Sequence, residues 1–357
     1  MTRAAQATID LGALQHNLRK VRAAAPGRRV MAVIKANGYG HGIITVARAL
    51  GDADAYAVAC LDEAMSLREA GITQPIVLLE GFFSAAELPI LVRENILTVV
   101  HHHYQLEMLE QGGLNGALRV WIKVDSGMHR LGFAPDAVAA VWQRLQSCGG
   151  VSVIGFMSHL ASADEPHDDT TRQQISRFND AVAALPGERS LANSAGILAW
   201  PATQNDWVRP GIMLYGVSPF AGQTGANLGL QPVMSLQSQL IAIHPRRRGE
   251  RIGYGGDYVC PAEMTVGVVA IGYGDGYPRH IRPGAPVLVN GRRAPLIARV
   301  SMDMLCVDLR DQAAARCGDP VSLWGPELPV EEVAAAAGTI PYELLCRVTA
   351  RVRKQTR

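Results

Sequence analysis

Eight short apolar runs recur between residues 29 and 215, and their alternation with helical segments is the feature that most constrains the fold. The intervening segments are rich in alanine and leucine at helical spacing, as in 61–70, 135–146 and 171–185. Strands that alternate with helices are typical of parallel βα units. The sequence therefore predicts a (β/α)8 barrel with strands in the runs 29–35, 53–60, 75–80, 97–101, 118–124, 151–158, 189–193 and 207–213.

Helical patterns become rare after residue 222. Short strand-like pieces, separated by Gly, Pro, Asp and Asn turns, indicate a mostly-β unit that ends in one short helix near 330–336. We therefore expect a barrel domain over residues 9–225 and a C-terminal β domain over 226–357, with residues 1–8 joining the second domain. The strand-like pieces are 237–243, 264–271, 285–289, 304–308 and 320–323.

Charge and composition exclude several classes of function. The chain has 34 basic and 32 acidic residues, well mixed, so no basic surface for nucleic acid is expected. It contains no apolar run of roughly 18 residues and no hydrophobic leader, which predicts a cytoplasmic protein without a membrane span. The six cysteines are dispersed and should be reduced. His101, His102 and His103 would alternate faces on a strand, so we expect no metal site there.

A lysine stands at the end of the first apolar run. Lys35 is followed at once by a glycine-rich turn that contains Tyr39. Desolvation of such a lysine would lower the pKa of its amine, as attack on a carbonyl to form a Schiff base requires. In isolation, a lysine that extends from a strand end into water is the commoner explanation, so the rest of the chain has to decide.

Other polar residues lie at the C-terminal ends of the predicted strands, the face where ligands bind in this fold. Lys123 lies on the fifth strand, before a turn that projects Arg130. A recurrent phosphate site follows the last two strands, and a phosphate-bearing cofactor opposite a Schiff-base lysine points to pyridoxal phosphate. The residues at the last three strand ends are His159, Asn193, Ser194, Arg209, Gly211 and Ile212.

Over essentially its whole length the chain resembles the alanine racemase family, which combines such a barrel with a β domain and depends on pyridoxal phosphate. The matching motifs come in the family order. They are Ala32-Val-Ile-Lys-Ala-Asn-Gly-Tyr-Gly-His-Gly42, Lys123-Val-Asp-Ser-Gly-Met-His-Arg130, Ala192-Asn-Ser-Ala195, Arg209-Pro-Gly-Ile212, Gly253-Tyr254-Gly255, Ile271-Gly-Tyr-Gly-Asp-Gly-Tyr277, Arg299-Val-Ser-Met-Asp303 and Ile340-Pro-Tyr342.

The resemblance implies a role for each polar residue around the cofactor. Lys35 would carry the cofactor, His159 would pack near its ring, and Arg209 would face the pyridine nitrogen. Because arginine keeps its proton, Arg209 would leave that nitrogen unprotonated, which disfavours transamination. The residues at the strand-seven end and around the phosphate would be Tyr39, Asn193, Ser194, Gly211, Ile212 and Tyr342.

The resemblance also implies a two-base mechanism in a homodimer. Lys35 would take the proton from D-alanine, and Tyr254 from the partner chain would serve the opposite face, with its phenolate favoured by His159 linked to Arg209. The substrate carboxylate would be bound by Arg130 and the amide of Met302 from the partner. Carbamylated Lys123 would orient Arg130, and Tyr273 and Tyr342 would narrow the entrance to the size of alanine.

Three other functions compete with an alanine racemase. The barrel and the lysine also fit a small non-catalytic protein that buffers pyridoxal phosphate, and decarboxylases of basic amino acids. The segments Gly253-Tyr254-Gly255 and Ser301-Met302-Asp303 argue against both. A broader-specificity racemase is the nearest alternative, although such enzymes usually carry a signal sequence. We therefore predict an enzyme that interconverts L- and D-alanine and supplies D-alanine for peptidoglycan.

Overall fold

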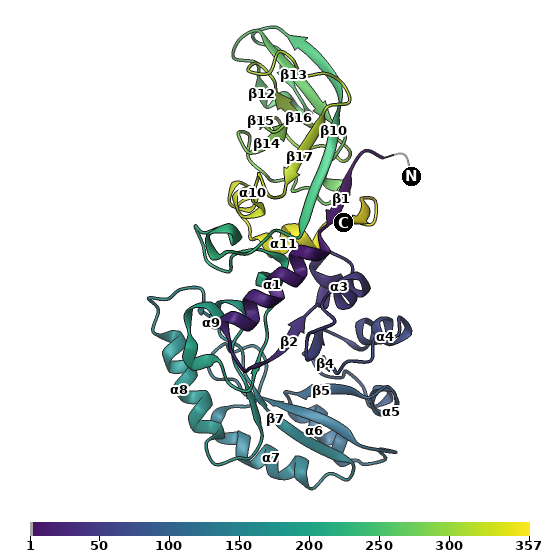
Figure 1. Ribbon diagram of the computed structural model, residues 1–357, viewed down its shortest axis with the longest axis vertical. Coiled ribbons are helices and arrows are strands. Elements are labelled where there is room, and N and C mark those ends of the chain that lie inside the picture. Colours follow the sequence, from purple (N-terminus) through teal and green to yellow (C-terminus); the bar gives the residue numbers. More distant parts are fainter. Residues whose placement is uncertain (1–2) are drawn as a thin grey trace.

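A closed parallel barrel of eight strands forms the first part of the chain in a computed structural model that describes residues 3–357 (Figure 1). The last strand pairs with the first through Arg29 and Trp207. A barrel strand lies within or overlaps each of the eight predicted runs, so the predicted (β/α)8 barrel is confirmed. The strands are β2 (Arg29–Val33), β3 (Ala55–Val58), β4 (Ile76–Leu78), β5 (Ile96–Val100), β6 (Leu118–Lys123), β7 (Val151–Met157), β8 (Glu188–Ser190) and β9 (Trp207–Val208).

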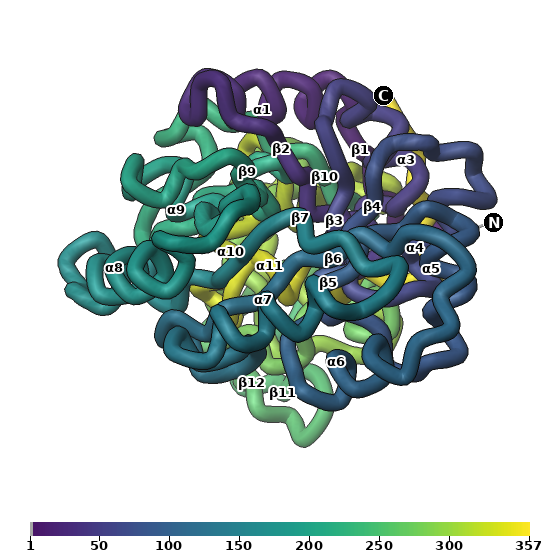
Figure 2. The backbone as a smooth tube through the Cα atoms, turned by 90° about the horizontal axis from the view of Figure 1, so that it is seen from below, coloured from purple at the N-terminus to yellow at the C-terminus, as the bar shows by residue number. Residues whose placement is uncertain are grey.

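Helices surround the barrel on its outside, as the view from below shows (Figure 2). The first helix begins where Asp10 accepts a hydrogen bond from the amide of Ala13 at 2.9 Å, which caps its free N–H groups. The apolar stripe of this helix, which includes Leu14 and Val21, is buried. The helices are α1 (Leu11–Ala24), α3 (Ile43–Ala49), α4 (Leu61–Glu69), α5 (Leu88–Arg93), α6 (His103–Glu110), α7 (Val138–Gln146), α8 (Thr170–Val182) and α9 (Ser194–Ala199).

The second part of the chain is an antiparallel sheet that closes on itself. Strand β13 pairs with both β16 and β10, so six strands form a ring in the order β13, β16, β15, β14, β17 and β10. A separate hairpin joins β11 (Arg251–Ile252) and β12 (Tyr258–Val259). The ring strands are β10 (Met234–Arg246), β13 (Met264–Val269), β14 (Pro286–Val289), β15 (Arg292–Ile297), β16 (Leu305–Asp308) and β17 (Pro320–Trp324).

Both ends of the chain join this second sheet. Strand β1 (Gln6–Ile9) pairs antiparallel with β10 and parallel with β18 (Arg353–Thr356). The prediction that one short helix ends the chain was wrong, because α10 (Val330–Ala337) is followed by α11 (Pro341–Cys346) and then by β18. Helix α11 has six residues, too few to show a helical period, and its start is marked only by Pro341.

One hydrophobic core runs through both parts of the chain, from Ala5 to Val352. All six cysteines are unpaired. Among the helices of residues 3–357, none is long and apolar enough to cross a bilayer. Several large apolar side chains nevertheless remain exposed on the second part, namely Ile241, Tyr254, Val259, Met302, Met304 and Ile340.

Candidate functional site

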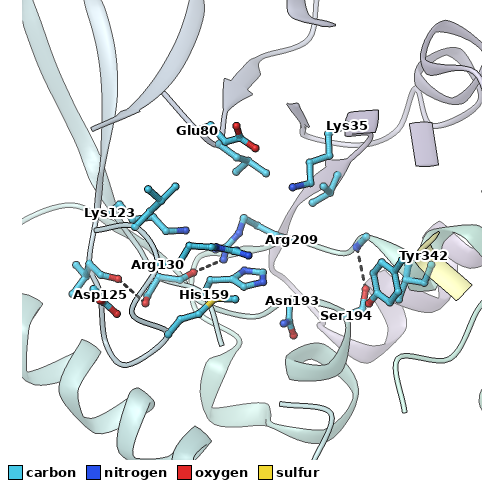
Figure 3. Close-up of a pocket in the computed structure, with 18 of the residues that line it drawn as sticks. Lys35, Glu80, Lys123, Asp125, Arg130, His159, Asn193, Ser194, Arg209 and Tyr342 are labelled. Carbon is cyan, nitrogen blue, oxygen red and sulfur yellow. Dashed lines mark hydrogen bonds between the residues drawn. The ribbon is translucent and has the colours of Figure 1, made fainter. Parts of the chain in front are cut away.

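A cavity of about 550 Å³ opens at the C-terminal ends of the barrel strands (Figure 3). Most of the site residues predicted from the sequence line this one cavity. Helix α11 adds a side chain from the far end of the chain. The predicted residues that the cavity brings together are Lys35, Tyr39, Lys123, Arg130, His159, Asn193, Ser194, Arg209, Gly211, Ile212 and Tyr342.

Lys35 reaches the cavity from a left-handed turn that follows β2. Ala36, Asn37 and Gly38 have φ values of 52°, 54° and 62°, a conformation that non-glycine residues rarely adopt. The carboxylate of Glu63 in α4 accepts from the amide of Ala36 at 2.7 Å and from the amide of Ala59 at 2.8 Å. Lys35 itself is half-buried, so its side chain is partly removed from water. The turn points its amine into the cavity (Figure 3).

Helix α11 packs directly on this turn. A Cβ atom at Gly40 would collide with the carbonyl oxygen of Leu345, so only glycine allows the close approach. The approach brings the ring of Tyr342 to 6.0 Å from that of Tyr39, which stacks on Tyr215 at 4.6 Å. Burial raises the pKa of both Tyr39 and Tyr342. Both hydroxyls therefore keep their protons and are available as hydrogen-bond donors.

A second group of polar atoms lies beside Tyr39. The hydroxyl of Ser194 accepts from the amides of Gly211 at 3.0 Å and Met213 at 3.3 Å. A Cβ atom at Gly211 would lie 2.6 Å from the hydroxyl oxygen of Tyr39 and would fill this space. Ser194 and Tyr342 thus lie on one side of the cavity, across from Lys123 and Arg130 (Figure 3), and the Tyr39 hydroxyl lies next to Gly211 on the same wall.

Arg209 is a buried cation, with 4% of its surface exposed. It donates to the hydroxyl of Ser190 at 2.6 Å and to the carbonyl of Ser158, and in residues 3–357 no carboxylate pairs with it. Burial lowers the pKa of Arg209 to about 10, so the guanidinium stays charged at neutral pH. Facing the cavity, it can donate a hydrogen bond but cannot accept one.

Burial and neighbouring cations also lower the pKa of the basic residues on the opposite wall. For Lys123 they lower the pKa to about 7, and burial is the largest cause, followed by the positive charges of Arg209 and Arg130. The same causes hold the pKa of His159 well below its usual value, so the imidazole is neutral. A neutral His159 cannot supply the positive charge that was expected to favour the phenolate of Tyr254. The positive charges near His159 include those of Arg209 and Arg130.

One acidic residue of the cavity was not predicted from the sequence. Glu80 lines the wall between Lys35 and Lys123 (Figure 3). Its position at the C-terminal end of the third predicted run was the available signal. The other acid, Asp125, accepts from the amides of Gly127 and His129 at 3.0 Å and shapes the turn before Arg130.

Within residues 3–357, no three His, Cys, Asp or Glu side chains are placed to bind one ion. Of the three consecutive histidines, His101 instead interacts with the carbonyl of Glu80 at 2.9 Å.

Three predicted residues do not lie in the cavity of their own chain. Tyr254, Tyr273 and Met302 all belong to loops of the second part. Tyr254 is 64% exposed and Met302 is 51% exposed. None of the three side chains lines the cavity that contains Lys35 of the same chain.

The cavity fits pyridoxal phosphate. Lys35 offers an amine to its aldehyde, and the hydroxyls of Tyr39, Ser194 and Tyr342 offer donors to a phosphate. Arg209 has no carboxylate partner among the described residues and suits a pyridine nitrogen, which can only accept while it is unprotonated.

The sequence is similar to those of known alanine racemases. The models for the alanine racemase N-terminal and C-terminal domains match residues 9–219 and 233–356. An alanine racemase of Nitrosococcus oceani is 56% identical over 348 residues, which cover 97% of this chain and 98% of the relative. One of Vibrio parahaemolyticus is 53% identical and covers 99% of each chain.

Solved structures agree with the sequence comparisons. The crystal structure of the biosynthetic alanine racemase of Pseudomonas aeruginosa superposes with a TM-score of 0.97 at 48% identity and covers 100% of each chain. The alanine racemase of Acinetobacter baumannii gives a TM-score of 0.93 at 40% identity, also with 100% coverage of both chains.

Proposed function

The chain belongs to the alanine racemase family, and from this we propose that it interconverts L-alanine and D-alanine with pyridoxal phosphate. The family match confirms the resemblance drawn from the motifs, the assignment as an isomerase and the cofactor. The observation that carries the proposal is that Lys35 and Arg209 line the same cavity. The amine of Lys35 would then face the cofactor aldehyde, and the charged guanidinium of Arg209 would face the pyridine nitrogen.

Lys35 would hold the cofactor, and Arg209 would limit what the cofactor does. When bound, pyridoxal phosphate stabilises negative charge at the substrate α-carbon after a proton leaves. By donating a hydrogen bond to the pyridine nitrogen, Arg209 would keep that nitrogen unprotonated and would limit how much negative charge the cofactor draws away from the α-carbon. Arg209 therefore favours racemisation over transamination.

Racemisation needs a proton donor and acceptor on each face of the α-carbon, and we propose Lys35 for one face and Tyr254 of the partner subunit for the other. Tyr254 is exposed and does not line the cavity of its own chain, which supports this arrangement in a homodimer. Tyrosine has a reference pKa of about 10, so nearby positive charge must favour the phenolate. Arg209 and Arg130 supply that charge.

The substrate carboxylate would be bound by Arg130 and by the backbone amide of Met302 from the second subunit. Tyr273 of that subunit and Tyr342 would narrow the entrance. The exposure of Met302 supports this assignment, because about half of the surface of Met302 is accessible and could contact a partner. Selection for alanine would then be steric, since a larger side chain would meet the two tyrosine rings.

Lys123 is proposed to carry a carbamate. Its pKa of about 7 leaves much of the amine neutral at physiological pH, and a neutral amine can add CO2. The product is an anion in a cavity lined by Lys35, Arg130 and Arg209. It can accept hydrogen bonds from Arg130 and so orient that side chain.

We further propose that the enzyme works in the cytoplasm and supplies D-alanine for peptidoglycan. The chain would act as two units, residues 9–225 and residues 226–357, with residues 1–8 joining the second. The family match supports this division, because the two domain models meet between residues 219 and 233.

The test is turnover of single enantiomers by the purified holoenzyme. Both enantiomers of alanine, serine, lysine and arginine are incubated separately, and the opposite enantiomer is measured by chiral chromatography. We expect kcat/KM for alanine to exceed that for lysine and arginine by about 100-fold or more, because steric exclusion acts on several methylenes. Comparable turnover of lysine would indicate a broader-specificity racemase, and cofactor binding without any turnover would contradict the proposal.

A further inference from the structure

Asp275 is a buried carboxylate that connects both ends of the chain. It lies in the short helical turn η7 (Tyr273–Asp275) and is 0% exposed. Arg3 donates to it from Nε at 2.7 Å and pairs with it a second time through Nη2. Arg351 places its Nε 3.5 Å from the same carboxylate. A buried charge is costly unless it is paired and hydrogen-bonded, and here arginines from both termini pair with it.

The same two arginines reach a second loop. Arg3 donates to the carbonyl of Asp303 at 3.2 Å, and Arg351 pairs with the Asp303 carboxylate. Backbone hydrogen bonds join the same two loops. The amide of Tyr273 donates to the carbonyl of Ser301 at 3.0 Å, and the amide of Gly274 donates to the carbonyl of Met302 at 2.9 Å. The loop that bears Tyr273 and the loop that bears Met302 are therefore held as one unit.

Contacts on the other side fix the position of this unit. The Asp275 carboxylate accepts from the amide of Gly272 at 3.0 Å, and the Asp275 carbonyl accepts from the amide of Thr349 at 3.1 Å. The hydroxyl of Thr349 donates to the carbonyl of Gly274 at 3.0 Å. The two loops are thus attached to the segment between α11 and β18, while Met302 itself remains exposed.

We propose that Asp275, Arg3 and Arg351 form a positioning clamp that sets Tyr273 and Met302 in the geometry needed by the active site of the partner subunit. The proposal rests on the shared active site of the proposed function. It assigns no chemistry to the clamp, whose members lie outside the cavity. It states that the clamp of one subunit acts on substrate binding in the other.

Positioning and fold stability can be separated, because other contacts already hold the chain ends. Strand β1 pairs with β10 and β18 along four residues each. The side chains of Arg3 and Arg351 are 26% and 41% exposed, so their loss opens no core. Removal of Arg351 leaves Asp275 paired with Arg3, so it should shift the loops and leave the fold in place.

The first test compares Arg351→Gln with Arg351→Lys, and with Arg353→Gln as a matched control at an exposed arginine of β18. Holoenzymes are assayed for KM and kcat with each enantiomer of alanine, for cofactor absorbance and for Tm. We expect KM to rise about tenfold or more in Arg351→Gln, as ångström-scale misplacement of a substrate contact can produce. Cofactor absorbance and Tm should hold, Arg351→Lys should recover part of the loss, and Arg353→Gln should match the wild type.

The second test asks in which subunit the clamp acts. Lys35→Ala chains lack the reactive lysine, and Asp275→Asn chains lack the clamp. A mixed dimer has one site that combines Lys35 of the Asp275→Asn chain with the intact loops of the Lys35→Ala chain. We expect mixing to restore activity with the KM of the wild type. Should Asp275→Asn fail to fold, Arg351→Gln takes its place in the same scheme.

Two outcomes would overturn the proposal that the clamp positions Tyr273 and Met302. An unchanged KM in Arg351→Gln, or mixed dimers demonstrated by mass spectrometry that lack restored activity, would each contradict it. Both outcomes leave racemisation by the wild type intact. Failure of the proposed function is distinct, because the wild-type holoenzyme would then not racemise alanine at all.

Discussion

Lys35, Lys123, Arg130 and Arg209 place four basic groups around one cavity, and only two acidic residues line it with them. Asp125 is engaged by two backbone amides of its own turn. Positive charge therefore exceeds negative charge among the protein groups of the site. A bound phosphate, a substrate carboxylate and a carbamate on Lys123 would each reduce this excess.

The carbamate proposed for Lys123 should depend on pH, because the pKa of the Lys123 amine is about 7. Below this pH the amine is an ammonium and does not react with CO2, whereas above it the neutral amine reacts. In protein equilibrated with 13C-bicarbonate, we expect a carbamate NMR signal that grows as pH rises through about 7. The signal should vanish in Lys123→Ala and persist in Lys354→Ala, another lysine whose pKa burial lowers. Full activity without any carbamate signal would contradict the assignment.

Tyr254 provides the test of the second base. In Tyr254→Phe we expect racemisation to fall by about 10²- to 10⁴-fold in both directions, the usual contribution of a general acid or base. Lys35 should still exchange the α-proton of D-alanine with D2O, while exchange from L-alanine is lost. Proton NMR in D2O measures both rates.

Tyr258→Phe, in the same hairpin, is the matched control and should behave as the wild type. Equal loss of exchange from both enantiomers in Tyr254→Phe would show that Tyr254 does not serve one face of the substrate.

The left-handed turn after β2 is the structural element that aims Lys35. Ala36 and Asn37 have positive φ although neither is glycine. Other contacts therefore have to stabilise the turn. Glu63 does so with both carboxylate oxygens, and the side chain of Asn37 accepts from the amide of Ile43 at 2.9 Å.

Glu63→Gln should therefore weaken cofactor binding. Glutamine keeps one acceptor oxygen and turns an amino group toward the second amide, so one hydrogen bond to a charged group, worth about 1.5–3 kcal/mol, is lost. We expect the dissociation constant for pyridoxal phosphate to rise about tenfold or more, measured by cofactor absorbance. Asp62→Asn, at an exposed neighbour in α4, should leave it unchanged, and an unchanged constant in Glu63→Gln would refute the role.

Elements with a clear apolar pattern could be predicted from the sequence, and those without one could not. The barrel strands and α1 have buried faces that the spacing reveals. Strand β15 was missed because Arg292, Arg293 and Pro295 interrupt its apolar residues. The glycine-rich turn after Lys35 was predicted, but its left-handed geometry at Ala36 could not be, because Glu63, which accepts from the amide of Ala36, is distant in the sequence.

The site as a whole divides in the same way. Lys35, Lys123, His159 and Arg209 could be predicted because strand ends of a barrel meet on one face. Tyr342 required the family resemblance, since its helix had no sequence signal. For Tyr254, Tyr273 and Met302 no geometry within one chain suffices, because their proposed site lies in a second subunit.

The proposed activity of the whole molecule requires covalent attachment of the cofactor to one lysine, and borohydride reduction of the holoenzyme tests this requirement most directly. Reduction fixes the cofactor to the amine that holds it, and peptide mass mapping then identifies the residue. We expect a pyridoxyl phosphate group on Lys35 alone. A group on Lys123, or a purified protein that takes up no pyridoxal phosphate and yields no modified peptide, would contradict it.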